Sequence, residues 1–186
     1  MQKLAFAERK ETTFKSITPQ SEAAANLQHD MDDPLLSTLK RIFGFDEFKP
    51  GQQEIIESIM AGRDGLVLLP TGGGKTLCFT LPALLSDGLC IVVLPTISLM
   101  QDISEKLTSI CQTVTLSSLS TSVERDTILQ NLPNIKVLLT TPESPQHIMI
   151  MDKLKKVTIS QIIVDKAHCI DEWGYQFPLT AWSVQG

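Results

Sequence analysis

The sequence has few of the features that mark secreted, membrane-spanning or metal-stapled proteins. Its four cysteines are widely spaced, with no pair at C-x-x-C spacing and no histidines at zinc-ligand spacing. No apolar run approaches the roughly 18 residues that are needed to cross a bilayer, and residues 1–14 lack the apolar core of a signal peptide. We therefore expect an unsecreted protein with buried, reduced thiols and no membrane partner.

A basic excess is also missing. The chain of 186 residues has 16 Lys and Arg against 21 Asp and Glu, which gives a net charge of -5. A strongly basic face is the usual electrostatic footprint of a nucleic-acid-binding protein, so any such function has to be argued from motifs. With 42% hydrophobic residues, a chain of this length can bury one core, and we expect one globular domain.

The spacing of the apolar residues changes along the chain. Residues 1–33 are polar and have no sustained period of 3.6 or 2, so we predict a flexible leader there. From residue 34, helical spacing predicts two helices, and short apolar runs then alternate with helical segments. The predicted strands are 66–69, 89–94, 113–116, 136–140 and 159–164, and the predicted helices between them are 75–85, 97–109, 122–130 and 145–153.

The predicted strands are almost continuously hydrophobic, which is typical of parallel strands that are buried on both faces. The alternation of such strands with helices predicts an α/β fold in layers with right-handed crossovers. We assign residues 34–177 to this domain and residues 178–186 to a divergent tail.

A glycine-rich loop joins the first predicted strand to the helix that follows it. Successive glycines let the backbone curl so that N–H groups point inward, and the start of the helix adds its positive dipole end. Lys75 can then reach the β- and γ-phosphates of ATP, and Thr76 can bind Mg²⁺. The strict phosphate-loop pattern has glycine at the position of Leu69 in this chain. The alternative interpretation is a glycine-rich turn with an incidental lysine. The predicted nucleotide-binding string is Pro70, Thr71, Gly72, Gly73, Gly74, Lys75 and Thr76.

Residues upstream of this loop extend the match. The segment 39–52 resembles the adenine-recognition motif of the RecQ family of DNA helicases. The resemblance implies that Phe45 stacks on the base, that Gln52 hydrogen-bonds its edge, and that Lys49 stands where the family usually has arginine. Taken alone, Phe45 and Phe48 also fit as core aromatics, with Gln52 as a solvated helix residue.

Two strand ends downstream, at 92–102 and 140–143, are similar to the family's motifs that contact the DNA backbone. The resemblance implies that Ser98 and Thr141 contact DNA, because a strand end followed by a helix N-terminus presents N–H groups and small hydroxyls. Capping of the following helices explains both residues equally well.

The predicted strand 159–164 is followed by Asp165, Lys166, Ala167 and His168, a string that looks like the helicase Asp-Glu-Ala-His motif. The resemblance implies that Asp165 holds Mg²⁺ and that His168 couples the nucleotide site to the DNA side. Lys166 replaces the family's glutamate, which orients and deprotonates the attacking water, and an ammonium group accepts no proton. We therefore expect ATP hydrolysis to be crippled. A sequencing error is the alternative, because one base change exchanges glutamate and lysine codons.

Residues 171–177 are similar to the family's aromatic-rich loop, in which a tryptophan and a phenylalanine meet single-stranded DNA. The resemblance implies that Trp173 and Phe177 stack on bases. The family commonly has His-Asp-Phe-Arg where this chain has Tyr-Gln-Phe-Pro at 175–178, so the charged side chains of the family's loop have no counterpart at these positions.

Over residues 36–177 the resemblance implies a RecA-like phosphate-loop NTPase fold in three layers, with a mainly parallel sheet, as a single incomplete helicase lobe. It implies a truncated first lobe of an ATP-dependent 3′-to-5′ DNA helicase that binds ATP, Mg²⁺ and single-stranded or forked DNA. Without the second lobe, which supplies an arginine finger in the family, we expect hydrolysis and unwinding to be deficient.

Localisation and alternatives follow from the same resemblance. We expect the nucleus if the source is eukaryotic and the cytoplasm otherwise. A non-catalytic nucleotide-binding module that regulates a partner is the alternative function, and a small phosphate-loop kinase is a weaker one.

Overall fold

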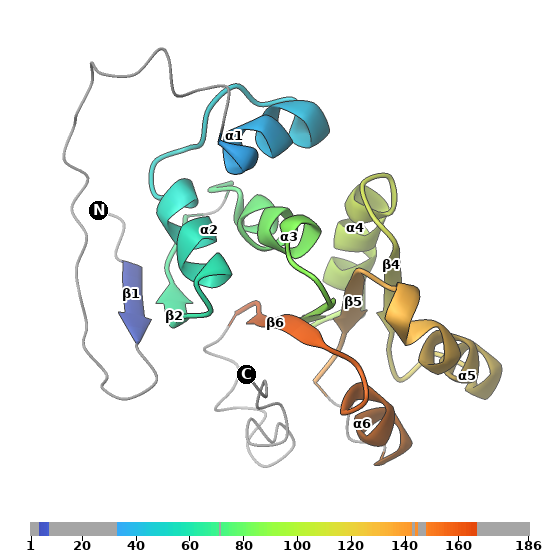
Figure 1. Cartoon of the computed structure of the whole chain (residues 1–186). Coiled ribbons are helices and arrows are strands. Elements are labelled where there is room, and N and C mark those ends of the chain that lie inside the picture. Colours follow the sequence, from blue (N-terminus) through green and yellow to red (C-terminus); the bar gives the residue numbers. More distant parts are fainter. Residues whose placement is uncertain (1–3, 8–32, 71, 143, 145–147, 167–186) are drawn as a thin grey trace, which may run out of the picture. The chain divides into compact units, whose positions relative to one another are not determined.

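The computed structural model describes residues 4–7, 33–70, 72–142, 144 and 148–166. The chain divides into two compact units, Met1–Leu85 and Ser86–Gly186. Figure 1 labels most of their helices and strands, numbered in chain order. Among the described residues, no helix combines the length and the apolar character that crossing a bilayer requires.

Helices dominate the first unit. Asp33 starts the first of them, because its side chain accepts a hydrogen bond from the N–H of Leu35 at 2.8 Å, and Gly44 ends the π-helical turn η1 in the left-handed region with φ 71°. Two clusters of buried side chains, one around Leu39 and Ile56 and one around Ile55, hold the unit together. The helical segments are α1 (Pro34–Thr38), η1 (Leu39–Phe43), α2 (Gln52–Met60) and α3 (Lys75–Leu85).

The first unit also holds two short strands, β1 (Leu4–Ala7) and β2 (Asp64–Val67), which pair antiparallel. β1 falls within the segment for which we predicted a flexible leader. The prediction of a parallel strand buried on both faces is wrong for β2, because β1 is its antiparallel partner and Leu66 is 47% exposed. A short apolar run does not by itself distinguish a central parallel strand from an antiparallel one.

The second unit is an α/β sandwich built on a parallel sheet in the order β4-β5-β3-β6. Its two inner strands are buried along their whole length, as near-continuous hydrophobicity predicted. The sheet's core includes Leu89, Ile91 and Leu138, against which buried helix residues such as Leu129 and Leu154 pack. Its elements are β3 (Leu89–Val93), α4 (Ile97–Thr108), β4 (Thr113–Leu116), α5 (Ser122–Asn131), η2 (Leu132–Asn134), β5 (Val137–Thr140), α6 (Ile148–Leu154) and β6 (Ile159–Val164).

Side-chain caps explain where two of these helices begin. The Thr96 hydroxyl accepts from the N–H of Leu99 at the start of α4. At the start of α5, Thr121 and Glu124 form a reciprocal capping box. The backbone N–H of Thr121, and then its hydroxyl, lower the pKa of the Glu124 carboxyl.

Parallel strands bring their carboxyl ends to one edge of the sheet. In the second unit, β5 and β6 both pair parallel with β3, with Val93 opposite Thr140 and Val164, so the residues that follow these three share that edge. The predicted α/β class with a parallel sheet is thereby confirmed. The sheet also sets which of the predicted site residues lie together.

Leu138→Ala is expected to destabilise the second unit. Leu138 lies on a central strand and is 1% exposed, so truncation leaves a cavity that costs about 2 to 5 kcal/mol. Urea denaturation followed by circular dichroism measures the change. Leu119→Ala is the matched control, because Leu119 is 74% exposed and its truncation should stay within about 0.5 kcal/mol. Equal midpoints for the two variants would contradict this placement of the core.

Candidate functional site

The glycine-rich loop of the first unit leads into α3 at Lys75. Gly72 and Gly74 both have φ 77°, a conformation that side chains strongly disfavour, and the N–H of Gly73 donates to the carbonyl of Pro70 at 3.0 Å. The opening N–H groups of a helix have no partner within it, so the loop and the first turn of α3 form a cradle suited to an anion. Lys75 is exposed at this point.

Lys49 and Gln52, both predicted to bind nucleotide, lie against this loop. Gln52 is only 4% exposed, and its Nε2 donates to the carbonyls of Gly73 at 3.3 Å and Gly74 at 3.4 Å. Its Oε1 accepts from the backbone N–H of Lys49 at 2.8 Å, and the Lys49 ammonium donates to the carbonyl of Gly72 at 3.1 Å. The structure therefore brings together residues that are 21 to 23 positions apart in sequence.

The aromatic residues near Gln52 separate into an exposed one and a packed one. Phe45 is 56% exposed, whereas Phe48 packs against the buried cluster around Leu39 and Ile56. The alternative that Phe45 is a core aromatic residue and Gln52 a solvated helix residue is therefore wrong. For Phe48, the interpretation as a core aromatic residue is confirmed. An exposed aromatic face is available for stacking on a planar ligand.

The two predicted DNA-contacting hydroxyls of the second unit lie in different surroundings. Ser98 is exposed on the first turn of α4, and the cap of that helix is Thr96, so capping does not explain Ser98. Thr141 is 1% exposed, with its hydroxyl 2.9 Å from that of Ser144, which is also buried. Motif and spacing did not predict this buried pair of hydroxyls, because the partner lies three residues further along the chain, outside the quoted motif.

Asp165 lies directly beyond β6, where its N–H donates to the carbonyl of Val93 at 3.0 Å. This bond extends the pairing of β3 and β6 by one residue and fixes the backbone at the strand end. Lys166 follows with φ 57°, the left-handed region, and its side chain is exposed. An exposed ammonium group therefore stands immediately after the predicted Mg²⁺ ligand.

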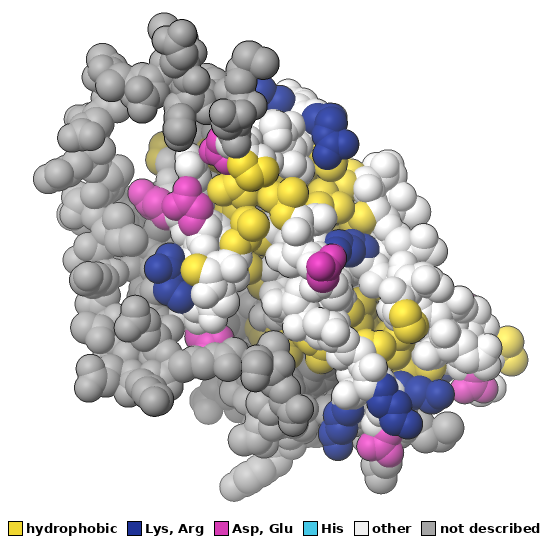
Figure 2. Space-filling model, viewed as in Figure 1, with side chains coloured by type: hydrophobic (Ala, Val, Ile, Leu, Met, Phe, Trp, Pro, Cys, Tyr) yellow, Lys and Arg dark blue, Asp and Glu magenta, His cyan; other side chains and the backbone are white. Residues whose placement is uncertain are grey.

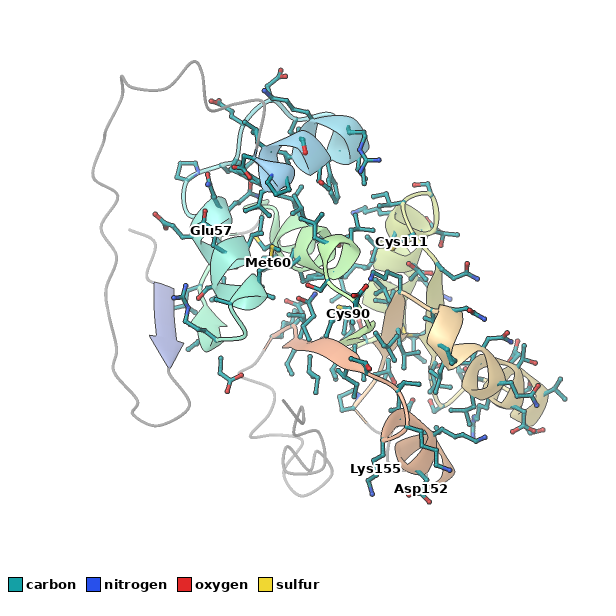
Figure 3. All side chains as sticks on the ribbon, in the orientation of Figure 1. Glu57, Met60, Cys90, Cys111, Asp152 and Lys155 are labelled. Atoms are coloured by element: carbon teal, nitrogen blue, oxygen red, sulfur yellow. The ribbon has the colours of Figure 1, made fainter. Side chains whose placement is uncertain are left out.

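Cys78 and Cys90 behave as structural thiols. Burial raises the pKa of both Cys78 and Cys90 to about 12, and Cys90 accepts a hydrogen bond from Nε2 of the buried Gln161 at 3.1 Å. Figure 3 labels Cys90 on the sheet and Cys111, which is half-buried, near α4. A thiol that stays protonated at neutral pH is a poor nucleophile and metal ligand, so neither Cys78 nor Cys90 is a candidate for chemistry.

Several predicted site residues lie outside the described ranges. In the parts of the chain that the structure describes, no three His, Cys, Asp or Glu side chains gather into a metal site. The predicted Mg²⁺ ligands Thr76 and Asp165 belong to different units. The residues outside the described ranges are Thr71, His168, Trp173 and Phe177.

Comparisons with known proteins agree with these motifs. Residues 49–182 match the DEAD/DEAH box helicase family. Over 145 residues the chain is 43% identical to the probable ATP-dependent DNA helicase RecS of Bacillus subtilis, with 77% of this chain and 29% of that protein covered. It is 34% identical over 145 residues to the ATP-dependent DNA helicase RecQ of Pasteurella multocida, with 76% and 23% covered. The chain thus spans less than a third of the length of these relatives.

Solved structures show the same fold. A helicase Lhr of Mycobacterium smegmatis, bound to single-stranded DNA and AMP-PNP, is similar with a TM-score of 0.61 at 25% identity, over 76% of this chain and 21% of that one. A hypothetical ATP-dependent RNA helicase from Sulfolobus tokodaii is similar with a TM-score of 0.58 at 21% identity, over 76% and 43%. Together with the matched motifs, these likenesses show that the chain belongs to the DEAD/DEAH box helicase family, with RecQ-type DNA helicases among its similar relatives.

Proposed function

We propose that this chain binds ATP with Mg²⁺ and contacts DNA as the first lobe of a RecQ-type 3′-to-5′ helicase, and that its own ATP hydrolysis is deficient. The observation that carries ATP binding is the arrangement of Gln52 and Lys49 against the glycine loop at the start of α3. It combines an anion cradle with an amide able to pair with adenine and the exposed ring of Phe45. Few other ligand classes need all three.

The donor chemistry of the chain fits Mg²⁺, which DEAD/DEAH helicases generally use with ATP. Thr76 offers a hydroxyl on the first turn of α3, and Asp165 offers a carboxylate at the end of β6. Hard oxygen ligands of this kind, completed by phosphate oxygens and water, are what Mg²⁺ prefers. When bound, the ion would neutralise charge on the phosphates.

Lys166 is the reason for proposing deficient hydrolysis. In this position an ammonium group cannot take a proton from water, and loss of a positioned general base typically costs about 10²- to 10⁴-fold in rate. Lys166 also places a positive charge next to Asp165, where the family's motif has a general base. The lysine at position 166 does not alter Lys75 or the loop amides. The chain should therefore still bind ATP although it hydrolyses ATP slowly.

The DNA contact is proposed for the carboxyl edge of the sheet in the second unit. Ser98 presents an exposed hydroxyl on the first turn of α4, where helix N–H groups add to an anion-binding surface. On the face shown in Figure 2, the dark-blue Lys and Arg side chains form separate groups and no continuous stripe. The chain has a net charge of -5, so we expect electrostatic attraction to contribute modestly. Single-stranded or forked DNA would be held by localised hydrogen bonds and by stacking on Trp173 and Phe177.

A regulatory function is the second candidate. Lys166 favours it, because a domain that binds ATP but turns it over slowly holds its bound state for longer. In that case the chain acts as a nucleotide-dependent module on a partner or on DNA. Nuclear localisation in a eukaryote, or a cytoplasmic one otherwise, is compatible with both candidates.

Saturable binding of a fluorescent ATP analogue in Mg²⁺ is expected, and Lys75→Ala should weaken it. Charge-assisted hydrogen bonds contribute about 1.5 to 3 kcal/mol, so the dissociation constant should rise roughly ten- to a hundredfold. Lys40→Ala, on the exposed surface of η1, is the charge-matched control and should bind as the wild type does. Equal affinities of the Lys75 variant and the wild type would exclude the phosphate loop as the binding site.

Lys166→Glu is expected to raise the rate of phosphate release from bound ATP by about 10²-fold or more, because it restores a proton acceptor. The measurement is single-turnover release of inorganic phosphate with the protein in excess. Lys166→Gln is the control that removes the positive charge without supplying a base. If the glutamine variant is as fast as the glutamate variant, charge and not the missing base limits the wild type; if neither exceeds the wild type, Lys166 is not the defect.

A further inference from the structure

A pocket of about 490 Å³, which we call the amino-edge pocket, lies within the second unit where its parallel strands begin. Its walls are the segments that lead into β3, β5 and β6, residues 87–89, 132–136 and 156–158. Backbone bonds fix these segments against one another, since the N–H of Leu89 donates to Thr158 at 2.9 Å and that of Cys90 to Lys136 at 3.0 Å. The proposed DNA contact, by contrast, is at the carboxyl edge of the sheet.

Gly88 allows two of these segments to approach each other closely. Its φ is 101°, and a Cβ at this position would lie 2.6 Å from the carbonyl oxygen of Thr158. A side chain here would therefore push the start of β6 away from the start of β3. The shape of the amino-edge pocket is thus set by backbone packing at the sheet edge.

Lys136 places a half-buried ammonium group in the amino-edge pocket. Its Nζ donates to the carbonyl of Ser86, 50 positions earlier in the chain. An ammonium group has three donors, so two remain for other partners. No carboxylate oxygen of the described residues lies within 4.0 Å of this nitrogen, and a partly desolvated cation without an anionic partner is unfavourable. Lys136 is therefore suited to an anionic group that comes from outside the chain.

Positive charge gathers beside this group. Lys156 also lines the pocket, and Lys153 and Lys155 precede it at the end of α6. Together with Lys136 they are four of the seven basic residues of the second unit. Figure 2 shows one of its dark-blue groups in the region that α6 occupies in Figure 1. The amino-terminal edge of the sheet is thus locally basic in a chain whose net charge is -5.

The helix dipole and a surface ion pair explain part of this charge. The carboxyl end of a helix carries partial negative charge, and Lys153 lies in the last turn of α6. Lys155 pairs with Asp152 at 3.8 Å, on the exposed surface where Figure 3 labels both residues. Neither explanation applies to Lys136, because it precedes a strand and has no carboxylate beside it among the described residues.

We propose that the amino-edge pocket binds an acidic peptide segment of a partner protein, in which carboxylates flank an apolar side chain. The carboxylates bond to Lys136 and Lys156, and the apolar side chain packs on Pro133 and Val157, which line the same pocket. The volume lies within the range of about 300 to 1,000 Å³ that is usual for ligand pockets. This interaction is additional to ATP and DNA binding and does not depend on either.

A peptide fits the lining better than nucleic acid does. Of the described lining residues, none is aromatic and none is arginine, so the pocket offers neither base stacking nor bidentate contact with phosphate. Asp87 lines the pocket as well, and its carboxylate opposes a continuous phosphate backbone. Discrete carboxylates on an apolar segment can bond to the two lysines and avoid Asp87.

The probe is a short fluorescein-labelled peptide in which glutamates flank a leucine, and its fluorescence anisotropy with the full chain measures affinity. The wild type should bind it saturably, with a dissociation constant of about 10 to 100 μM, and a peptide with glutamine in place of glutamate should bind about tenfold more weakly. Lys136→Met should weaken binding of the glutamate peptide about tenfold, because methionine keeps an apolar stem but removes the charge.

Two further variants control for folding and for net charge. Lys156→Ala alters an exposed side chain, so it should fold as the wild type does and still bind the peptide several-fold more weakly. Lys40→Met removes the same charge from η1, outside the pocket, and should leave peptide affinity unchanged. Binding of the ATP analogue should be the same in the Lys136 and Lys156 variants as in the wild type, so this proposal and the proposed function fail separately.

Three results would overturn the peptide site. One is the absence of saturable binding of the glutamate peptide to the wild type. Another is equal peptide affinity of the wild type and the folded Lys136 and Lys156 variants. The third is an oligothymidylate that binds more tightly than the peptide and loses its affinity in both variants, because the occupant of the pocket would then be nucleic acid.

Discussion

The buried carboxamide of Gln52 is the contact on which the proposed nucleotide site depends. It joins the first turn of α2 to a loop more than twenty residues later, and both ends of the amide are engaged. An unsatisfied buried polar group costs about 1 to 3 kcal/mol, so these bonds favour one arrangement of loop and helix over others. Packing of α2 on α3, through buried residues such as Ile55 and Cys78, supports the same arrangement. Gly72 and Gly74 allow the loop to adopt this conformation, and the hydrogen bonds of Gln52 stabilise it relative to others.

In the second unit, the parallel sheet has the corresponding role. Because β3, β5 and β6 run in the same direction, their ends deliver Ser98, Thr141 and Asp165 to one edge without any contact among these side chains being needed. A slip of one residue would exchange the side chains on the two faces of a strand, and since both faces of β3 and β5 are buried, it would disrupt packing on each of them. The predicted contact residues of the second unit are thus positioned by backbone pairing, and those of the first unit by side-chain hydrogen bonds.

The sequence predicted most helices and strands because their apolar periods are regular: α3, β4 and β6 have the predicted bounds. It could not predict that β2 pairs antiparallel with β1, because β1 is only four residues long and its residues show no hydrophobic periodicity. Loop motifs gave Gln52 and Lys49 as nucleotide-binding residues but not their bonds to loop carbonyls. Such bonds form only when two segments more than twenty residues apart in sequence come into contact, and the spacing of residues along the chain does not predict that contact.

The conformation of Lys166 bears on whether the altered motif affects folding or chemistry. A left-handed φ of 57° costs any residue with a Cβ about 1 to 2 kcal/mol, and glutamate and lysine have the same Cβ. The strain therefore belongs to the turn after β6, where the N–H of Asp165 is fixed to Val93, and not to the choice of lysine. Exchanging the two residues leaves this cost unchanged and alters only the charge and the proton-accepting group on an exposed side chain. A lobe carrying lysine here should then fold as one carrying glutamate does, so that a hydrolysis defect would be local to this side chain.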